Sequence, residues 1–214
     1  GGRKMFKIIK RDLTVILSNK RERLFLLFYI PFLILIIESY EPKWLYLSIL
    51  VAYTYMFSIM GMAYDMKGKG KYIMNSLPIT RKEFVLYKYL SIFVYFFLTI
   101  VYSGVYLWII NKIGLKSVEY FNLKMIMEAL PIVMISIAIV FPAYFRFEPR
   151  IAQIVHMIVF LTFFIGLVNL NIVGMNSIVK RIGFFEGQKK LLVATVIYIL
   201  SLILSLRLYE NRDL

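Results

Sequence analysis

The chain has 214 residues, of which 61% are hydrophobic and 17% aromatic, and its net charge is +14. A soluble domain is roughly 45–50% apolar, so this composition leaves little sequence for a separate soluble domain. Cysteine is absent, which excludes a disulfide framework, a thiolate metal site and a thiol nucleophile. The single histidine cannot form a histidine-rich metal centre, so we expect neither a catalytic residue nor a metal site in this chain.

Six stretches of the sequence are apolar and almost free of charge. The hydrocarbon core of a bilayer is about 30 Å thick and is crossed by about 20 apolar residues in a helix. Strands of a membrane barrel would alternate polar and apolar residues, and these stretches do not. The sequence therefore predicts an all-α, polytopic membrane protein with six transmembrane helices, in which residues 1–214 form a single transmembrane domain.

Residues 5–20 precede the first of these stretches. Apolar residues recur there every three to four positions, with Lys7, Lys10, Arg11 and Asp12 between them. This pattern predicts an amphipathic, interfacial (elbow) helix that lies on the inner membrane surface.

The predicted transmembrane helices cover residues 24–40, 44–64, 84–110, 126–145, 151–170 and 190–207. The first has only a short apolar run, residues 24–37, and contains Pro31, which predicts a kink. A signal peptide is the alternative for this segment, but residues 38–41 do not resemble a small-residue cleavage site. Between the last two helices, residues 171–189 form an outer loop or a re-entrant segment.

Most of the 26 basic residues fall before the first helix, in residues 65–82 or beside the other connections on the same face. The positive-inside rule assigns this face, with both termini, to the cytoplasm, although Lys180, Arg181, Lys189 and Lys190 in the outer loop count against it. We interpret the charge as orientation charge that meets membrane lipid, and we expect no nucleic-acid partner.

The middles of the predicted helices are nearly free of ionisable residues, which disfavours an ion-driven carrier. Lys88 lies near the start of the third helix, where we expect its side chain to snorkel to the membrane surface. His156 has no acidic partner in the sequence around it, and we expect it to form a hydrogen bond between helices rather than a proton relay.

Residues 65–82 form the largest predicted cytoplasmic loop. Gly68 and Gly70 break the preceding helix, residues 71–76 suit a short amphipathic helix, and Thr80 with Glu83 predicts a capping box that starts the third span. The Gly-Lys repeat at 68–71 lacks the spacing of a phosphate-binding Walker A motif. Any nucleotide that powers this protein must therefore bind another chain. The alternative is a basic loop that faces anionic lipid headgroups.

The run Ser76-Leu77-Pro78-Ile79-Thr80-Arg81, followed by Phe84-Val85-Leu86-Tyr87-Lys88-Tyr89-Leu90, resembles a loop of bacterial ABC-2-type transporter permeases. The resemblance is specific over residues 65–91 and extends in architecture to the whole chain. It points in particular to small Gram-positive permeases that export phenol-soluble modulins or confer resistance to peptide antibiotics.

This resemblance implies a membrane subunit of an ABC exporter in the bacterial cytoplasmic membrane. Two permeases, either two copies or a copy and a sister chain, would pair with cytoplasmic ABC ATPase subunits that bind ATP and Mg²⁺. This chain would bind no cofactor and would not be an enzyme. The coupling helix that contacts the ATPase would consist of Lys71, Tyr72, Ile73, Met74, Asn75 and Ser76.

The second and fifth spans are the expected lining of a path for an amphipathic or hydrophobic cargo, such as a toxin or antimicrobial peptide. Their aromatic and methionine side chains offer adaptable apolar surface. The expected lining residues are Tyr53, Tyr55, Met56, Met60, Phe160, Phe163 and Phe164. The alternative is that these side chains only pack between helices or face lipid.

Two other classes of protein remain to be distinguished. A non-transporting membrane anchor or an immunity protein that binds its ligand in the bilayer would have the same spans but no ATPase partner. A channel would have a continuous polar stripe along a helix, and the sequence has none.

Overall fold

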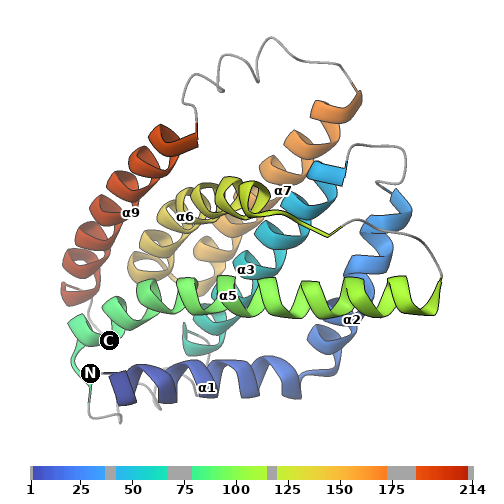
Figure 1. Ribbon diagram of the computed structural model, residues 1–214. Coiled ribbons are helices and arrows are strands. Elements are labelled where there is room, and N and C mark those ends of the chain that lie inside the picture. The colour runs from blue at the N-terminus through green and yellow to red at the C-terminus, as the bar shows by residue number, and fades with distance from the viewer. Residues whose placement is uncertain (1, 37–41, 67–78, 115–119, 173–186, 212–214) are drawn as a thin grey trace.

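The computed structural model describes residues 2–36, 42–66, 79–114, 120–172 and 187–211, and within these ranges it contains helices and no strands. The helices are α1 (Gly2–Ser18), α2 (Lys20–Ile36), α3 (Pro42–Met66), α5 (Arg81–Ile113), α6 (Leu123–Arg146), α7 (Pro149–Ile172) and α9 (Gly187–Glu210) (Figure 1). The predicted elbow helix and each predicted span correspond to one of them. The all-α class is therefore confirmed for the described residues.

Four of these helices, α3, α5, α6 and α9, are long and apolar enough to cross a membrane. They make the chain a multi-pass membrane protein. The predicted first and fifth spans are present as the helices α2 and α7, but they are not among these four. The number of six spans thus remains a prediction.

Helix α3 is the central helix of the described bundle. It contacts α1, α2, α5, α6 and α7, and its residues from Leu45 to Tyr55 are buried without exception. One side of α3, including Leu50 and Tyr55, packs in a cluster with α5, α6 and α9, and the other side, including Tyr46 and Tyr53, packs with α1, α2 and α5. A helix that is apolar on every side can be enclosed by protein or can face lipid, and α3 is enclosed by its neighbours.

Helix α5 has 33 residues and well-formed ends. The Thr80 hydroxyl accepts a hydrogen bond from the Glu83 amide at 3.1 Å, and the Glu83 carboxylate accepts one from the Thr80 amide at 2.9 Å. The predicted capping box is therefore confirmed. At the other end, Gly114 adopts φ 74°, a left-handed conformation that glycine tolerates without strain.

Helix α2 continues through Pro31, the position of the predicted kink. Proline has no amide hydrogen, so the carbonyl of Leu27 receives no helical hydrogen bond from position 31. The hydroxyl of Tyr106 on α5 donates to this carbonyl at 2.7 Å. At the preceding residue, the Leu26 carbonyl accepts from Tyr53 at 2.7 Å and from Tyr102 at 2.8 Å. Tyrosines of α3 and α5 thus hold α2 at its proline.

Helix α1 lies across one end of the molecule, beneath α5 (Figure 1). The start of α1, the start of α5 and the end of α9 meet at this end, because Lys4 pairs with Glu83 at 3.3 Å and Lys82 pairs with Glu210 at 3.1 Å. The end of α3 is tied to the same region by an ion pair between Arg11 and Asp65. We call the end of the molecule that holds these four helix termini the basal end.

Candidate functional site

A closed ring of four charged side chains joins α1, α3 and α5 at the basal end. Arg11 contacts Asp12 at 2.8 Å and Asp65 at 2.6 Å, and Lys88 contacts the same two carboxylates at 2.5 Å and 2.6 Å. The contact between Lys88 and Asp65 Oδ2 is an ion pair and lacks hydrogen-bond geometry. We call Arg11, Asp12, Asp65 and Lys88 the charge ring.

Three of the four side chains of the charge ring are buried, and the fourth, Arg11, is partly exposed. Lys88 is 1% exposed, Asp12 3% and Asp65 5%. Lys88 therefore does not snorkel to the membrane surface, and the sequence-based expectation for this residue was wrong. The ion pairs with two carboxylates supply the stabilisation that water would otherwise give to its ammonium group.

Asp12 also lies elsewhere than the sequence suggests. The amphipathic pattern counts it among the polar residues of the elbow helix, but it lies on the buried face of α1 with Ile8, Ile9 and Ile16. A signal for this was present, because Asp12 is four residues after Ile8 and four before Ile16, the spacing of one helix face. The sequence could not reveal that a cationic partner from another helix contacts that face.

The backbone of α3 comes unusually close to the ring at Gly61. A Cβ atom at this position would lie 2.8 Å from Asp12 Oδ2 and 3.4 Å from Lys88 Nζ. Only glycine leaves room for the carboxylate at this place. On the α5 side, the Tyr95 hydroxyl donates a hydrogen bond to Asp12 Oδ2 at 3.0 Å.

The electrostatics of the ring favour the ionised forms of its two members on α1, Asp12 and Arg11. Burial raises the pKa of the Asp12 carboxyl, but the Lys88 ammonium and the Arg11 guanidinium outweigh burial and hold this pKa below its ordinary value. Burial likewise lowers the pKa of Arg11, and the carboxylates of Asp65 and Asp12 reverse that effect. Two acids and two bases give a ring without net charge. Removing one partner from such a buried arrangement typically costs about 3–5 kcal/mol, because its counterion stays buried and unpaired.

The charge ring includes residues at both ends of the loop between α3 and α5. Asp65 is the last residue but one of α3, and Lys88 follows the start of α5 by two turns. The end of the loop that leads into α5 is held by further contacts, because Glu83 caps α5 and also pairs with Lys4 of α1. The Arg81 side chain donates to the Glu210 carbonyl of α9 at 3.1 Å. The predicted coupling residues Lys71–Ser76 themselves lie outside the described residues.

A second contact ties the end of α3 to the corner between α1 and α2. The Asn19 amide donates to the Tyr64 hydroxyl at 3.0 Å and to Glu22 Oε1 at 3.1 Å. Both ends of the loop are therefore attached to the elbow region by polar contacts. Such contacts, unlike apolar packing, lose their partner when the helices slide past one another.

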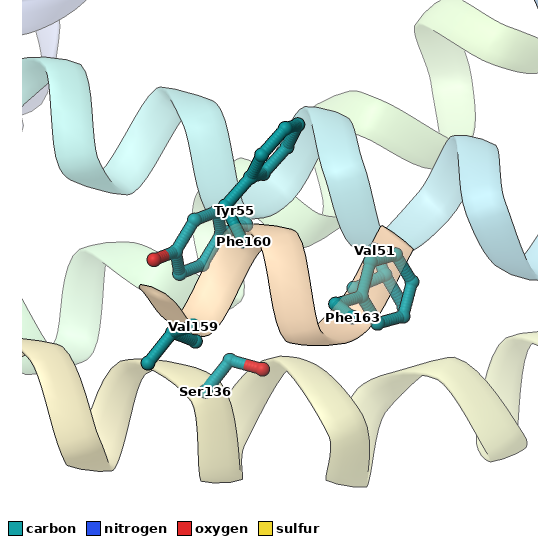
Figure 2. Close-up of a pocket in the computed structure, with 6 residues that line it drawn as sticks. All are labelled: Val51, Tyr55, Ser136, Val159, Phe160 and Phe163. Carbon is teal, nitrogen blue, oxygen red and sulfur yellow. The ribbon is translucent and has the colours of Figure 1, made fainter. Parts of the chain in front are cut away.

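Three of the predicted lining residues meet at one small cavity. Tyr55, Phe160 and Phe163 line it together with Val51, Ser136 and Val159, which brings α3, α6 and α7 together (Figure 2). Its volume of about 10 Å³ holds about one water molecule. This space between helices is too small for a peptide or a lipid chain.

His156 of α7 contacts Tyr55, a lining residue of this cavity, and so joins α7 to α3. The Tyr55 hydroxyl and His156 Nδ1 are 2.8 Å apart, and the two rings lie with their centroids 5.3 Å apart. The expected hydrogen bond between helices is therefore confirmed for His156. Phe160 stacks on Tyr55 at a centroid distance of 6.4 Å.

The other predicted lining residues are not gathered at the cavity. Tyr53 is fully buried on the opposite side of α3, facing α2, and Met60 packs in the same cluster. Met56 is half-buried. The side chain of Phe164 lies outside the described part of the chain, so the path through these residues stays a prediction.

A larger hollow lies between α2 and α7 and was not anticipated. It has a volume of about 400 Å³ and is lined by carbon-rich side chains. Four of them are on α2 and one is on α7: Phe25, Phe28, Tyr29, Phe32 and Phe160. Phe28 and Phe32 are more than half exposed. This aromatic groove is open at the surface of the bundle and is apolar throughout.

Among the described residues, no group of three or more histidine, aspartate or glutamate side chains is arranged to hold a metal ion. The charged side chains that are buried in the described part of the chain pair with one another in the charge ring. The arrangement suits a mechanical role at the basal end and an apolar contact surface at the groove.

Comparison with known proteins gives one result. A family model described as "ABC-2 family transporter protein" matches residues 7–210. Neither the curated proteins nor the solved structures yield a match to this chain.

Proposed function

The chain belongs to the ABC-2 family of transporter proteins, which are membrane subunits of ABC transporters, and from this premise we propose that it is an exporter permease. Its cargo is an amphipathic or hydrophobic molecule, such as a toxin or antimicrobial peptide, that leaves through a bacterial cytoplasmic membrane. The family match over residues 7–210 carries the proposal. The aromatic groove and the anchored loop support its details.

Family membership implies an ABC ATPase partner. On this proposal the partner binds ATP and Mg²⁺, and this chain performs no bond chemistry. The partner grips residues 71–76, and the basal end faces the cytoplasm. The attachment of residues Asp65 and Glu83 to α1 supports this proposal, because a loop with fixed ends transmits a displacement to the helices on both sides.

Transport then follows from a shift between two states of a pair of permeases, either two copies of this chain or this chain and a sister. ATP must bind the two states unequally in order to shift them. Closure of the ATPases moves the loops, tilts the helix bundles and opens a path to the outside at the interface of the pair.

The nature of the cargo is inferred from the lining side chains. Phe28, Phe32 and Phe160 offer aromatic surface in a groove of about 400 Å³ without a charged lining residue. Such a surface favours apolar side chains or acyl chains over ions and sugars. Tyr55 is buried and becomes accessible to cargo only if α3 and α7 separate, whereas Phe163 is half-buried.

The partner is tested by purifying the tagged chain with the ATPase encoded beside it. We expect the two to co-purify, and we expect charge reversal at Lys69 and Lys71, or Ile73→Pro, to weaken the association. Lys124→Glu is the matched control, since this exposed lysine lies at the start of α6, far along the chain from the basal loop. If the wild-type chain binds no ATPase, the exporter proposal fails and a membrane anchor is favoured.

The cargo surface is tested by transport in reconstituted vesicles. Phe28→Ala combined with Phe32→Ala should reduce transport of an amphipathic peptide while the ATPase still co-purifies. Phe97→Ala is the control, because Phe97 is also exposed, at 64%, but lies on α5 away from the groove. Unchanged transport in the double variant, and also after alanine substitution of Tyr53, Met56 and Phe163, would remove this lining.

A further inference from the structure

The charge ring connects α1 to both ends of the loop that we propose the ATPase grips. Asp65 leads into the loop and Lys88 follows it, and both side chains meet Asp12 or its neighbour Arg11 on α1. A displacement of the loop must therefore move α1 as well, or separate buried opposite charges. The second course is unfavourable, since the charges of Asp12, Asp65 and Lys88 would remain out of water.

The ring restricts motion more than apolar packing would. Apolar side chains lose little interaction energy when they slide past one another. Each carboxylate of the ring, in contrast, has two cationic partners within 2.8 Å that a displacement would separate from it. The close approach of Gly61 to Asp12 fixes the position of α1 relative to α3. The Tyr95 hydrogen bond fixes the same carboxylate against α5.

We propose that Arg11, Asp12, Asp65 and Lys88 are positioning residues that make α1, the end of α3 and the start of α5 move as one rigid body during coupling. The inference rests on the proposed function and deepens it, because it names the part of the permease that the ATPase drives. Helix α1 is on this view a driven element and more than a membrane anchor. Its exposed Phe6 and Leu17 carry the motion to the membrane surface.

The test uses a variant that opens the ring without leaving a buried net charge. Asp65→Asn with Lys88→Met removes one acid and one base, and the Arg11–Asp12 pair remains. Lys88→Met alone leaves two carboxylates with one cation, so we expect a lower yield of folded protein that the added Asp65→Asn restores. Lys82→Met with Glu210→Gln is the matched control, because it removes an exposed ion pair at the same end without touching α1.

The natural absence of cysteine allows clean spin labelling. Labels at exposed Lys10 on α1 and exposed Leu86 on α5 report the distance between these helices in the complex of permease and ATPase. In the wild-type chain and the control we expect the same narrow distance distribution with and without nucleotide. In the opened-ring variant we expect a broadened distribution that changes with nucleotide.

Function is measured in the same preparations. We expect the opened-ring variant to co-purify the ATPase as wild type does, because residues 71–76 are intact. Transport per ATP hydrolysed should fall by about two- to thirty-fold, the range typical of changes along a coupling network. A wild-type distance that changes with nucleotide, or an opened-ring variant with wild-type transport per ATP, would overturn the rigid-body inference. Failure of the wild-type chain to bind an ATPase would instead overturn the proposed function.

Discussion

At the scale of single residues, the strongest electrostatic interactions join side chains whose pairing the sequence does not indicate. Lys88 and Asp12 are 76 positions apart and are both fully enclosed by the bundle. Each would be unfavourable alone, and each is stabilised by the other and by a second partner in the charge ring, Arg11 for Asp12 and Asp65 for Lys88. The stability of this ion pair therefore depends on how closely the helices approach each other. The approach is tightest at Gly61 of α3.

Gly61→Ala should destabilise the protein. The new methyl group would lie 2.8 Å from Asp12 Oδ2, so the carboxylate or a helix must shift, at a cost of about 1–3 kcal/mol. The measurement is unfolding in detergent followed by circular dichroism. Gly104→Ala is the control, since its methyl group would meet Phe121 at an ordinary 3.8 Å; equal stability of the two variants would contradict the close approach.

The stability of the protein should also depend on pH through Asp12. The pKa of this carboxyl in the folded state lies below its ordinary value of 3.8, so the unfolded chain binds a proton more readily. The stabilisation is therefore complete above about pH 5 and is lost as the pH falls below about 4, through the folded-state pKa. Melting temperatures between pH 7 and pH 3 test this. At pH 7 the Asp12→Asn variant should have a lower melting temperature than the wild type, but its melting temperature should fall less on acidification. An equal fall in both proteins would contradict the role of Asp12.

At the scale of the helices, α2 is held by its neighbours more than by its own sequence. Pro31 removes one hydrogen bond inside α2, and a tyrosine of α5 replaces it. In lipid an unsatisfied carbonyl is costly, because no water is present to bond it. The Tyr106 hydroxyl thus satisfies the carbonyl that the proline leaves without a helical partner.

A double-mutant cycle tests this dependence. Tyr106→Phe should cost about 1 kcal/mol, the usual scale of a hydrogen bond between membrane helices. In a Pro31→Ala background the cost should nearly vanish, because the substituted alanine would supply the missing amide to Leu27. Tyr102→Phe, whose partner is the Leu26 carbonyl, should cost the same in both backgrounds. Equal costs for Tyr106→Phe in both backgrounds, measured by unfolding in mixed micelles, would rule out the proposed role of Tyr106.

At the scale of the whole molecule, the basal end unites helix termini that are far apart in sequence. Lys4, Glu83 and Glu210 belong to α1, α5 and α9, and their side chains take part in neighbouring ion pairs. The orientation of this end decides whether a cytoplasmic ATPase can reach the loop between α3 and α5. The functional proposal therefore depends on topology.

Single cysteines test the orientation. Treatment of intact cells with a membrane-impermeant maleimide should label a Tyr120→Cys variant, between α5 and α6, but not a Glu148→Cys variant, between α6 and α7. Both native side chains are exposed, and α6 separates them by one crossing of the membrane. Labelling of Glu148→Cys should appear only after permeabilisation. The opposite pattern would put the basal end outside the cell and exclude a cytoplasmic ATPase.

The helices and their approximate bounds could be predicted from the amino-acid sequence alone. Apolar runs of sufficient length form helices in lipid whatever their neighbours are, because the backbone must satisfy its own hydrogen bonds there. The capping box at Thr80 and Glu83 was equally local, since both partners lie within one turn. The hydrogen bond of His156 could be anticipated in kind, although its partner Tyr55 lies 101 positions away.

The side chains that these helices bring together can be identified only in the folded chain. The charge ring needs Arg11, Asp12, Asp65 and Lys88 from three helices, and the aromatic groove needs α2 beside α7. Hydropathy does not encode such pairings, because apolar helices in lipid associate through shape and a few polar contacts rather than through burial from water. A charged residue near the end of a span satisfies the same pattern whether it reaches for the membrane surface or meets an opposite charge inside the bundle, and packing alone distinguishes the two.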